Sequence, residues 1–129
     1  MGEETSRYFD QVILLSQSTF ESVEFDINRT PERSILKIQA RYGQFRIFVT
    51  ELFSDERRKY RYYVLQKDWV KAGFDNSPDP RALYLKYGKI GKKHTGENIP
   101  HLHLDDKNLI LLTEEMTFES FVDWLLDNL

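Results

Sequence analysis

The chain of 129 residues contains no cysteine. This absence excludes disulfide bonds, cysteine-ligated zinc sites and a cysteine nucleophile, and it is typical of proteins in a reducing cytoplasm. No apolar stretch approaches the roughly 20 residues that a membrane-spanning helix needs. The acidic first residues also lack the layout of a signal peptide. We therefore expect a cytoplasmic protein that folds without disulfides and does not span a membrane.

Glycine is infrequent, with six residues, and its spacing does not form a nucleotide-binding motif. The lysine-rich loop KYGKIGKKH (86–94) matches neither a Walker sequence nor a dinucleotide-binding fingerprint. No internal repeat is visible. A length of 129 residues with 40% hydrophobic residues predicts a single folded domain over residues 1–129.

Residues 20–67 alternate with period two between turn sequences such as NRTPER and RYGQ, which predicts strands. Because the connections are short, the strands are expected to form an antiparallel meander. The strands are predicted at 20–28, 34–42, 45–53 and 59–67. Helices are predicted at 5–17 with Thr5 as a possible cap, at 79–88 between Asp79 and Gly88, and after Thr117 to the end of the chain.

The alternation divides the predicted strands into two faces. The nearly apolar face comprises Val23, Phe25, Ile27, Leu36, Ile38, Ala40, Phe45, Ile47, Val49, Tyr60, Tyr62 and Val64. The opposite face collects cations and two aromatic residues, namely Lys37, Arg41, Arg46, Lys59, Arg61, Phe48 and Tyr63. We therefore predict an α+β fold: an antiparallel β-meander of four or more strands with the N- and C-terminal helices packed on one face.

The net charge of −3 conceals an uneven distribution of charge along the chain. Residues 29–93 contain 16 of the 18 lysines and arginines but only 7 of the 21 acidic residues. A basic surface within an acidic chain indicates a polyanionic partner such as RNA.

The cationic face has the composition of a nucleic-acid surface, because cations contact phosphates and aromatic rings stack on unpaired bases. The alternative is a solvated edge whose charges have no partner. The residues that we predict to contact nucleic acid are Lys37, Arg41, Lys59, Tyr63 and Phe48, together with Lys92 and Lys93 from the loop.

All three histidines fall within HTGENIPHLHLDD (94–106). In an extended HLH segment, His101 and His103 point to the same side. Three interpretations are open at this point: a strand with solvated polar residues, a proton-transfer site, or a metal site. A metal site would use His94, His101, His103 and Asp105, because imidazole and carboxylate are ligands of divalent ions.

The order of motifs resembles that of the TumE-type toxins of bacterial and archaeal toxin–antitoxin modules, over roughly residues 8–128. YRYYVLQKDW is followed by the FDNSP turn, then by IPHLHLDD and a final amphipathic helix. The matching positions are Tyr60, Tyr62, Trp69, Phe74, Asp75, Asn76, Pro78, Pro100, His101 and His103. After the turn the chain differs from the pattern, with Asp79 and Pro80 in place of histidines. The resemblance implies a toxin with a DNA-binding antitoxin partner, expected to be a small helix-turn-helix protein, and a ribonuclease activity.

The leading hypothesis is a metal-independent endoribonuclease without a cofactor. One of His101 and His103 would accept the 2′-hydroxyl proton and the other would protonate the leaving oxygen. Arg46, Arg61 or Lys93 would stabilise the charge that develops on the phosphate. A non-enzymatic module that binds nucleic acid or protein is the first alternative, and a metal-dependent hydrolase at the histidine cluster is the second.

Overall fold

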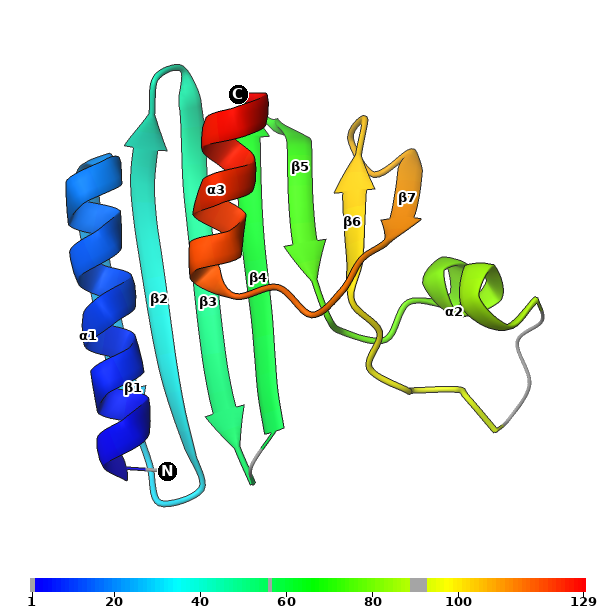
Figure 1. Cartoon of the computed structure of the whole chain (residues 1–129), viewed down its shortest axis with the longest axis horizontal. Coiled ribbons are helices and arrows are strands. Elements are labelled where there is room, and N and C mark those ends of the chain that lie inside the picture. The colour runs from blue at the N-terminus through cyan, green and yellow to red at the C-terminus, as the bar shows by residue number, and fades with distance from the viewer. Residues whose placement is uncertain (1, 56, 89–92) are drawn as a thin grey trace.

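The computed structural model describes residues 2–55, 57–88 and 93–129. Within these residues the chain forms three helices and one seven-stranded antiparallel sheet, in which each strand pairs with the next along the chain (Figure 1). The predicted α+β meander is therefore confirmed. The elements are α1 (Gly2–Thr19), β1 (Glu21–Arg29), β2 (Arg33–Tyr42), β3 (Phe45–Ser54), β4 (Arg57–Gln66), β5 (Trp69–Asp75), α2 (Pro80–Tyr87), β6 (His101–Leu104), β7 (Leu109–Leu112) and α3 (Phe118–Asn128).

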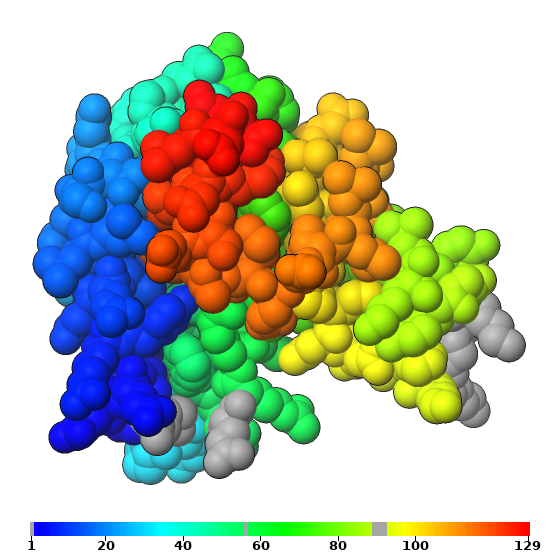
Figure 2. Space-filling model, in the orientation of Figure 1, coloured from blue at the N-terminus to red at the C-terminus, as the bar shows by residue number. Residues whose placement is uncertain are grey.

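The two terminal helices cover one side of the sheet, which we call the inner face. Figure 1 shows α1 and α3 in front of the strands, and Figure 2 shows them side by side in the space-filling view. Phe9 of α1 and Phe121 of α3 are fully buried there, together with Tyr60 and Tyr62 of β4. This burial supplies the main apolar core. None of the described helices combines the length and hydropathy that a membrane crossing requires.

Helix α2 lies against the opposite side of the sheet, which we call the outer face. Ala82 and Leu83 of α2 form a small apolar cluster with Ile99, and Ile110 of β7 packs against this cluster. Ile110 is the cross-strand partner of His103, and directly opposed residues of antiparallel strands point to the same face. Helix α2 therefore covers the outer face beside Ile110 and leaves it open over β2, β3 and β4.

The caps predicted for α2 and α3 are confirmed. The Asp79 carboxylate accepts hydrogen bonds from Arg81 N and Ala82 N, and Gly88 ends α2 in the left-handed region with φ 78°. The Thr117 hydroxyl accepts a hydrogen bond from Ser120 N. Such contacts satisfy amide and carbonyl groups that have no partner within the helix.

Two details of the predicted fold are wrong. Thr5 does not cap the first helix, because α1 begins earlier and Thr5 is buried inside it. Phe25 belongs to the inner face by its pairing with Ile38, but 49% of its surface is exposed. It lies on the edge strand β1, which the helices cover incompletely.

Strand β5 was missed because its sequence does not alternate. Its second half is buried continuously from Ala72 to Asp75, as expected of a strand covered on both faces. The pairing of β4 with β5 also shifts register between Val64 and Leu65. Such a bulge interrupts a period-two pattern. Strand β7 was missed for a related reason, since the run LILL (109–112) has no polar position.

Candidate functional site

A row of cross-strand partners connects the cationic residues with the histidines. Lys37 pairs with Thr50, and Thr50 pairs with Arg61. Arg61 pairs with Asp75, which pairs with His101. All members of the row point to the outer face because directly opposed residues share a face. The cations of β2 and β4 therefore lie on the same side of the sheet as the imidazole of β6.

A second row lies next to the first and brings an aromatic ring beside the other imidazole. It runs through Gln39, Phe48, Tyr63, Gly73 and His103. A Cβ atom on Gly73 would lie 3.0 Å from the Tyr63 ring, so the absence of a side chain allows this ring to lie across β5. The centroids of the Tyr63 and His103 rings are 6.4 Å apart.

The two rows enclose a hollow of about 400 Å³ on the open part of the outer face. Lys37 and Arg61 stand at its sides, and the Arg61 guanidinium carbon lies 5.3 Å from the centroid of the Tyr63 ring. The complete lining is Lys37, Gln39, Phe48, Thr50, Arg61, Tyr63 and Leu65. Cations next to exposed aromatic surface suit a phosphate together with an unstacked base.

The other residues predicted to contact nucleic acid do not all lie on the sheet. Arg41, Arg46 and Lys59 are exposed on the same face, and Arg46 donates a hydrogen bond to the Lys67 carbonyl at 3.1 Å. Lys93 is exposed in the turn at 93–96 and belongs to neither row. Lys92 lies outside the described residues. The structure thus brings together the sheet cations on the outer face, and Lys93 is not among them.

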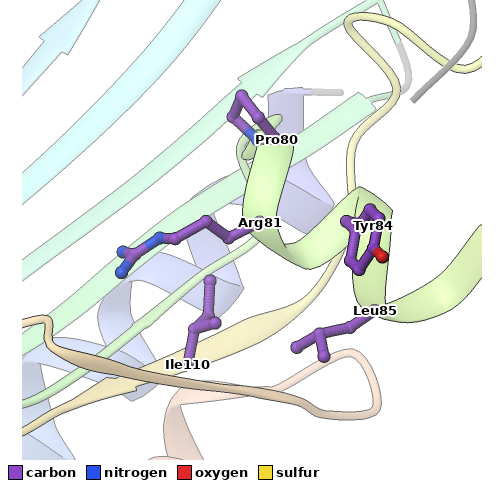
Figure 3. Close-up of a pocket in the computed structure, with 5 residues that line it drawn as sticks. All are labelled: Pro80, Arg81, Tyr84, Leu85 and Ile110. Atoms are coloured by element: carbon purple, nitrogen blue, oxygen red, sulfur yellow. The ribbon is translucent and has the colours of Figure 1, made fainter. Parts of the chain in front are cut away.

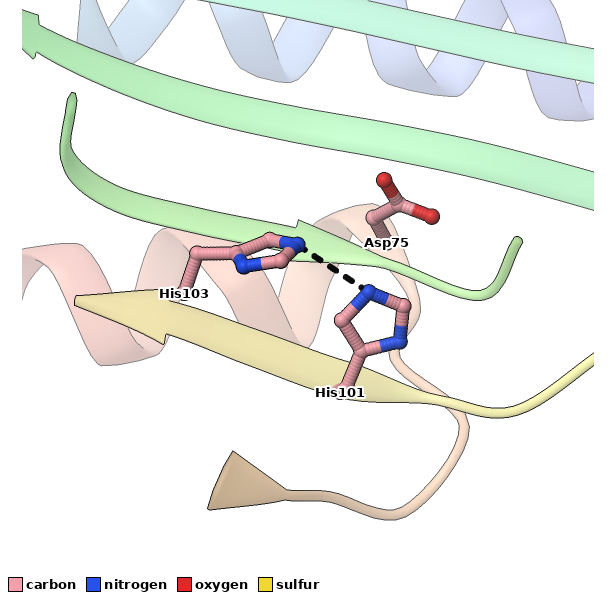
Figure 4. Close-up of side chains that lie close together, drawn as sticks. All are labelled: Asp75, His101 and His103. Atoms are coloured by element: carbon pink, nitrogen blue, oxygen red, sulfur yellow. Dashed lines mark hydrogen bonds between the residues drawn. The ribbon is translucent and has the colours of Figure 1, made fainter. Parts of the chain in front are cut away.

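The side chains of His101 and His103 form a closely coupled unit, which we call the histidine pair. Their Nε2 atoms are 3.1 Å apart and their rings are perpendicular (Figure 4). Nδ1 of His101 lies 2.6 Å from the carbonyl oxygen of Ile99. A carbonyl accepts hydrogen bonds and does not donate them, so His101 carries its proton on Nδ1 and presents a lone pair at Nε2.

The proton between the two rings then belongs to His103. Its Nε2–H donates to His101, which leaves Nδ1 of His103 as an acceptor, and this atom has no hydrogen-bond partner among the described residues. Burial lowers the pKa of His103, and the neighbouring His101 and Lys107 add to this effect. His103 is therefore neutral at pH 7, and one of its nitrogens is unsatisfied in a buried position.

Two carboxylates flank the histidine pair. Asp79 Oδ2 lies 4.0 Å from Nε2 of His101 and 3.9 Å from Nε2 of His103. Asp75, which Figure 4 shows beside the pair, is within 4.8 Å of the imidazole nitrogens. Its Oδ1 accepts from Ser77 N at 2.6 Å and its Oδ2 lies 3.6 Å from Nε of Arg61. The sequence did not predict that Asp75 and Asp79 lie beside the histidines. It predicted Asp79 only as a helix cap and Asp75 only as a turn residue.

His94 and Asp105 do not join this group. The His94 ring stacks on Tyr87 with centroids 3.6 Å apart, and its Nδ1 faces Glu97 at 3.4 Å. Asp105 is exposed in the turn that connects β6 with β7. Of the four residues considered as metal ligands, the structure brings together His101 and His103, with Asp75 and Asp79 beside them.

A second buried polar group lies on the inner face, and we call it the Glu51 cluster. Glu51 is fully buried and accepts hydrogen bonds from Arg58 at 3.0 Å and from the hydroxyl groups of Tyr8 and Tyr62. Burial and the neighbouring carboxylate raise the pKa of Tyr62, so its hydroxyl remains a donor. Arg58 also donates to the Met116 carbonyl at 2.8 Å, which ties β4 to the start of α3.

A further hollow, of about 370 Å³, lies between α2 and β7 (Figure 3). It is lined by Pro80, Arg81, Tyr84, Leu85 and Ile110. Tyr84 and Leu85 are themselves exposed. Because this surface is mainly apolar, it does not have the character of a phosphate-binding surface, in contrast to the open part of the outer face.

Comparison with known proteins identifies no relative. No family model matches the chain, and neither the curated proteins nor the solved structures contain a significant match. The function must therefore be inferred from the geometry of the outer face and the histidine pair.

Proposed function

We propose that this protein is the toxin component of a toxin–antitoxin module that acts in the cytoplasm by cleaving RNA, without a metal ion. The observation that carries the proposal is the cross-strand row that joins Lys37 and Arg61 to His101 on one face of the sheet. The resemblance to the TumE-type toxins supports the same conclusion from the sequence.

In this proposal the open outer face binds the RNA backbone. Lys37, Arg41, Arg46, Lys59 and Arg61 are all exposed there, and each cation that contacts a phosphate releases condensed counterions. Phe48 and Tyr63 lie between them and offer aromatic surface on which bases can stack. The surface needs no particular base sequence for these contacts.

The histidine pair would move the proton of the reaction. Because the Nε2 atoms are hydrogen-bonded to each other, the two rings act as one proton-sharing unit rather than as a base and an acid on opposite sides of a phosphate. The pair accepts the proton of the 2′-hydroxyl at Nδ1 of His103 as the 2′-oxygen attacks phosphorus, and returns it to the 5′-oxygen that leaves. Arg61 and Arg46, both on the outer face, would stabilise the charge on the phosphate.

The test is an RNA cleavage assay in excess EDTA with each histidine replaced in turn. We expect wild-type protein and His94→Ala to cleave, because His94 lies outside the pair. We expect His101→Ala and His103→Ala to lose cleavage while keeping the wild-type circular dichroism spectrum. Unchanged cleavage in both pair variants would remove the histidines from the mechanism.

The toxin assignment has its own test in cells. Expression of the wild-type chain should arrest bacterial growth, and His103→Ala should relieve the arrest. Co-expression of a neighbouring gene for a small helix-turn-helix protein should also restore growth. Normal growth on wild-type expression at high protein level would count against the toxin role.

The burial of the histidine pair favours a second candidate, a binding module that breaks no bond. His101 and His103 are 1% and 4% exposed, so RNA reaches them only after neighbouring side chains move. Under this alternative the open outer face holds nucleic acid or an acidic protein segment. Salt-sensitive RNA binding by wild-type protein without any cleavage product would favour it over the enzyme.

A further inference from the structure

We propose that the histidine pair and Asp79 form a binding site for a single divalent transition-metal ion of the zinc class. The site goes beyond the proposed function, which requires no metal. Its three donor atoms are Nε2 of His101, Nε2 of His103 and Oδ2 of Asp79. They come from β6 and from the cap of α2, which are joined through packing rather than through sequence.

The spacing of the three atoms matches the size of such an ion. The two Nε2 atoms are 3.1 Å apart, and Asp79 Oδ2 lies 4.0 Å and 3.9 Å from them. The point that is equally distant from the three atoms lies about 2.2 Å from each and in their plane. A tetrahedral zinc ion stands out of the plane of any three ligands and binds nitrogen and oxygen at about 2.0–2.2 Å, so it would draw Asp79 Oδ2 closer to the two nitrogens. Two nitrogen ligands of a tetrahedral ion are about 3.3 Å apart, which is close to the separation of the pair.

The hydrogen bonding around the pair also prepares it for a cation. Nδ1 of His101 donates to the Ile99 carbonyl, and an outer contact of this kind orients a metal-bound imidazole and leaves Nε2 free to coordinate. At a separation of 3.1 Å, two nitrogen lone pairs repel each other unless a cation lies between them. A proton fills this position in the metal-free chain, and a metal ion would replace it.

Asp79 is better suited than the neighbouring acids to complete the site. Its Oδ1 caps α2 through Arg81 N and Ala82 N, and this fixes the carboxylate while Oδ2 faces the imidazoles. Asp75 already accepts from Ser77 N and faces Arg61. Two imidazoles and one carboxylate leave a fourth position for water or for Asp75, and this ligand set suits zinc and related ions better than Ca²⁺ or Mg²⁺.

The ion and the proposed proton transfer compete for the same atoms. A metal ion held by both Nε2 atoms displaces the proton that the pair shares, and this proton moves to Nδ1 of His103, the acceptor that has no partner in the described part of the metal-free chain. The loaded protein then has no free imidazole nitrogen in the pair to accept a proton from the 2′-hydroxyl. Zinc would therefore inhibit RNA cleavage. This consequence rests on the proposed function, whereas binding of the ion does not.

The test measures Zn²⁺ binding to the chelator-stripped full-length protein by titration calorimetry, in the absence of RNA. We expect one bound ion per chain and a higher melting temperature in the presence of zinc. Loss of a residue that only supports a metal ligand weakens binding by about 10–100-fold. His101→Ala and His103→Ala remove a ligand itself and should weaken zinc binding by more than that. Asp79→Asn should weaken it strongly too, while its amide oxygen still caps α2. His94→Ala is the matched control and should bind like wild type.

The binding measurements test the metal site independently of whether the protein cleaves RNA. Absence of zinc binding in wild-type protein, or full binding in folded His103→Ala and Asp79→Asn, would overturn the site. Binding that depends on these three residues supports it, whether or not RNA is cleaved. Cleavage that zinc inhibits supports both proposals. Cleavage that zinc stimulates would retain the site and replace the metal-independent mechanism with a metal-dependent one.

Discussion

The Glu51 cluster on the inner face and the histidine pair on the outer face are both buried and polar, and they differ in how completely their atoms are paired. On the inner face, the Glu51 carboxylate receives hydrogen bonds from Arg58, Tyr8 and Tyr62. On the outer face, Nδ1 of His103 has no partner among the described residues, and Asp79 stands near the pair without a hydrogen bond to it.

The difference in hydrogen-bond pairing indicates a stabilising role for the Glu51 cluster and a chemical role for the histidine pair. Buried polar groups are normally paired because an unpaired one costs stability. A cluster whose donors and acceptors are all used has no capacity for a ligand, and the Glu51 cluster connects α1, β3, β4 and the start of α3. The histidine pair keeps free acceptor capacity on the face that carries the exposed cations. We therefore place function on the outer face.

The largest expected effect on stability comes from breaking the Glu51 cluster. Arg58→Met leaves the carboxylate of Glu51 buried without its cation, and removing one partner of a buried ion pair costs about 3–5 kcal/mol. Urea denaturation measures this loss. Arg57→Met, on the exposed side of the same strand, is the control and should change stability by less than about 0.5 kcal/mol. A similar small loss in Arg58→Met would contradict the structural role of the cluster.

A smaller loss is expected where the outer face is packed most tightly. Gly73→Ala places a Cβ atom 3.0 Å from the Tyr63 ring, and overpacking of this kind costs about 1–3 kcal/mol. Tyr63→Leu in the same chain should recover most of the loss in a denaturation experiment. Gly2→Ala is the control, because nothing lies within 4 Å of its added Cβ. Wild-type stability in Gly73→Ala would show that the ring moves aside freely.

Replacing Asp79 by Ala or by Asn distinguishes its role as the cap of α2 from its role as a carboxylate beside the histidine pair. Asp79→Ala removes the cap of α2 and should cost about 1 kcal/mol, within the range of about 0.5–2 kcal/mol for lost caps. Asp79→Asn keeps a capping oxygen, so its thermal unfolding should stay close to wild type. Both variants lose the carboxylate that faces the histidine pair. Equal stability of the two variants would mean that the cap contributes little.

The smallest effect on stability is expected at Arg61, which lies on β4 like Arg58 but points to the outer face. Its side chain is 58% exposed and faces the buried Asp75 at 3.6 Å, and a cation that remains mostly in solvent contributes about 0–1 kcal/mol through such a contact. Arg61→Met should therefore fold normally yet bind single-stranded RNA more weakly. The slope of log affinity against log salt should fall by about 0.7 for the lost phosphate contact. Lys86→Met on α2 is the control. An unchanged slope in Arg61→Met would show that Arg61 does not contact an RNA phosphate.

Much of the fold was predictable from residues close together in the chain. Period-two alternation placed β1 to β4 within two residues of their bounds, and it assigned Arg46, Arg61 and Tyr63 to one face. The caps Asp79 and Thr117 were predictable as well, because a cap acts on amides two or three residues away. The alternation did not predict the buried cluster around Glu51, a charged residue at an inner-face position. Its partners come from α1 and β4, which are distant in the chain.

The identity of the flanking carboxylates was not predictable for the same reason. Asp79 meets His101 and His103 across more than twenty residues of chain, and they come together because α2 packs on the outer face through Ile110. His94 lies closer to the pair in sequence, yet it stacks on Tyr87 instead. Proximity along the chain therefore suggested the wrong partners for the imidazoles.

Local rules of backbone geometry were enough to specify β1 to β4, their two faces and the caps of α2 and α3, because each depends on residues close together in the chain. Which polar groups are paired and which are left with an unused lone pair depended on packing between distant segments. Pairing requires a donor and an acceptor within about 3 Å of each other, and only the folded arrangement of sheet and helices sets such distances between residues far apart in the chain.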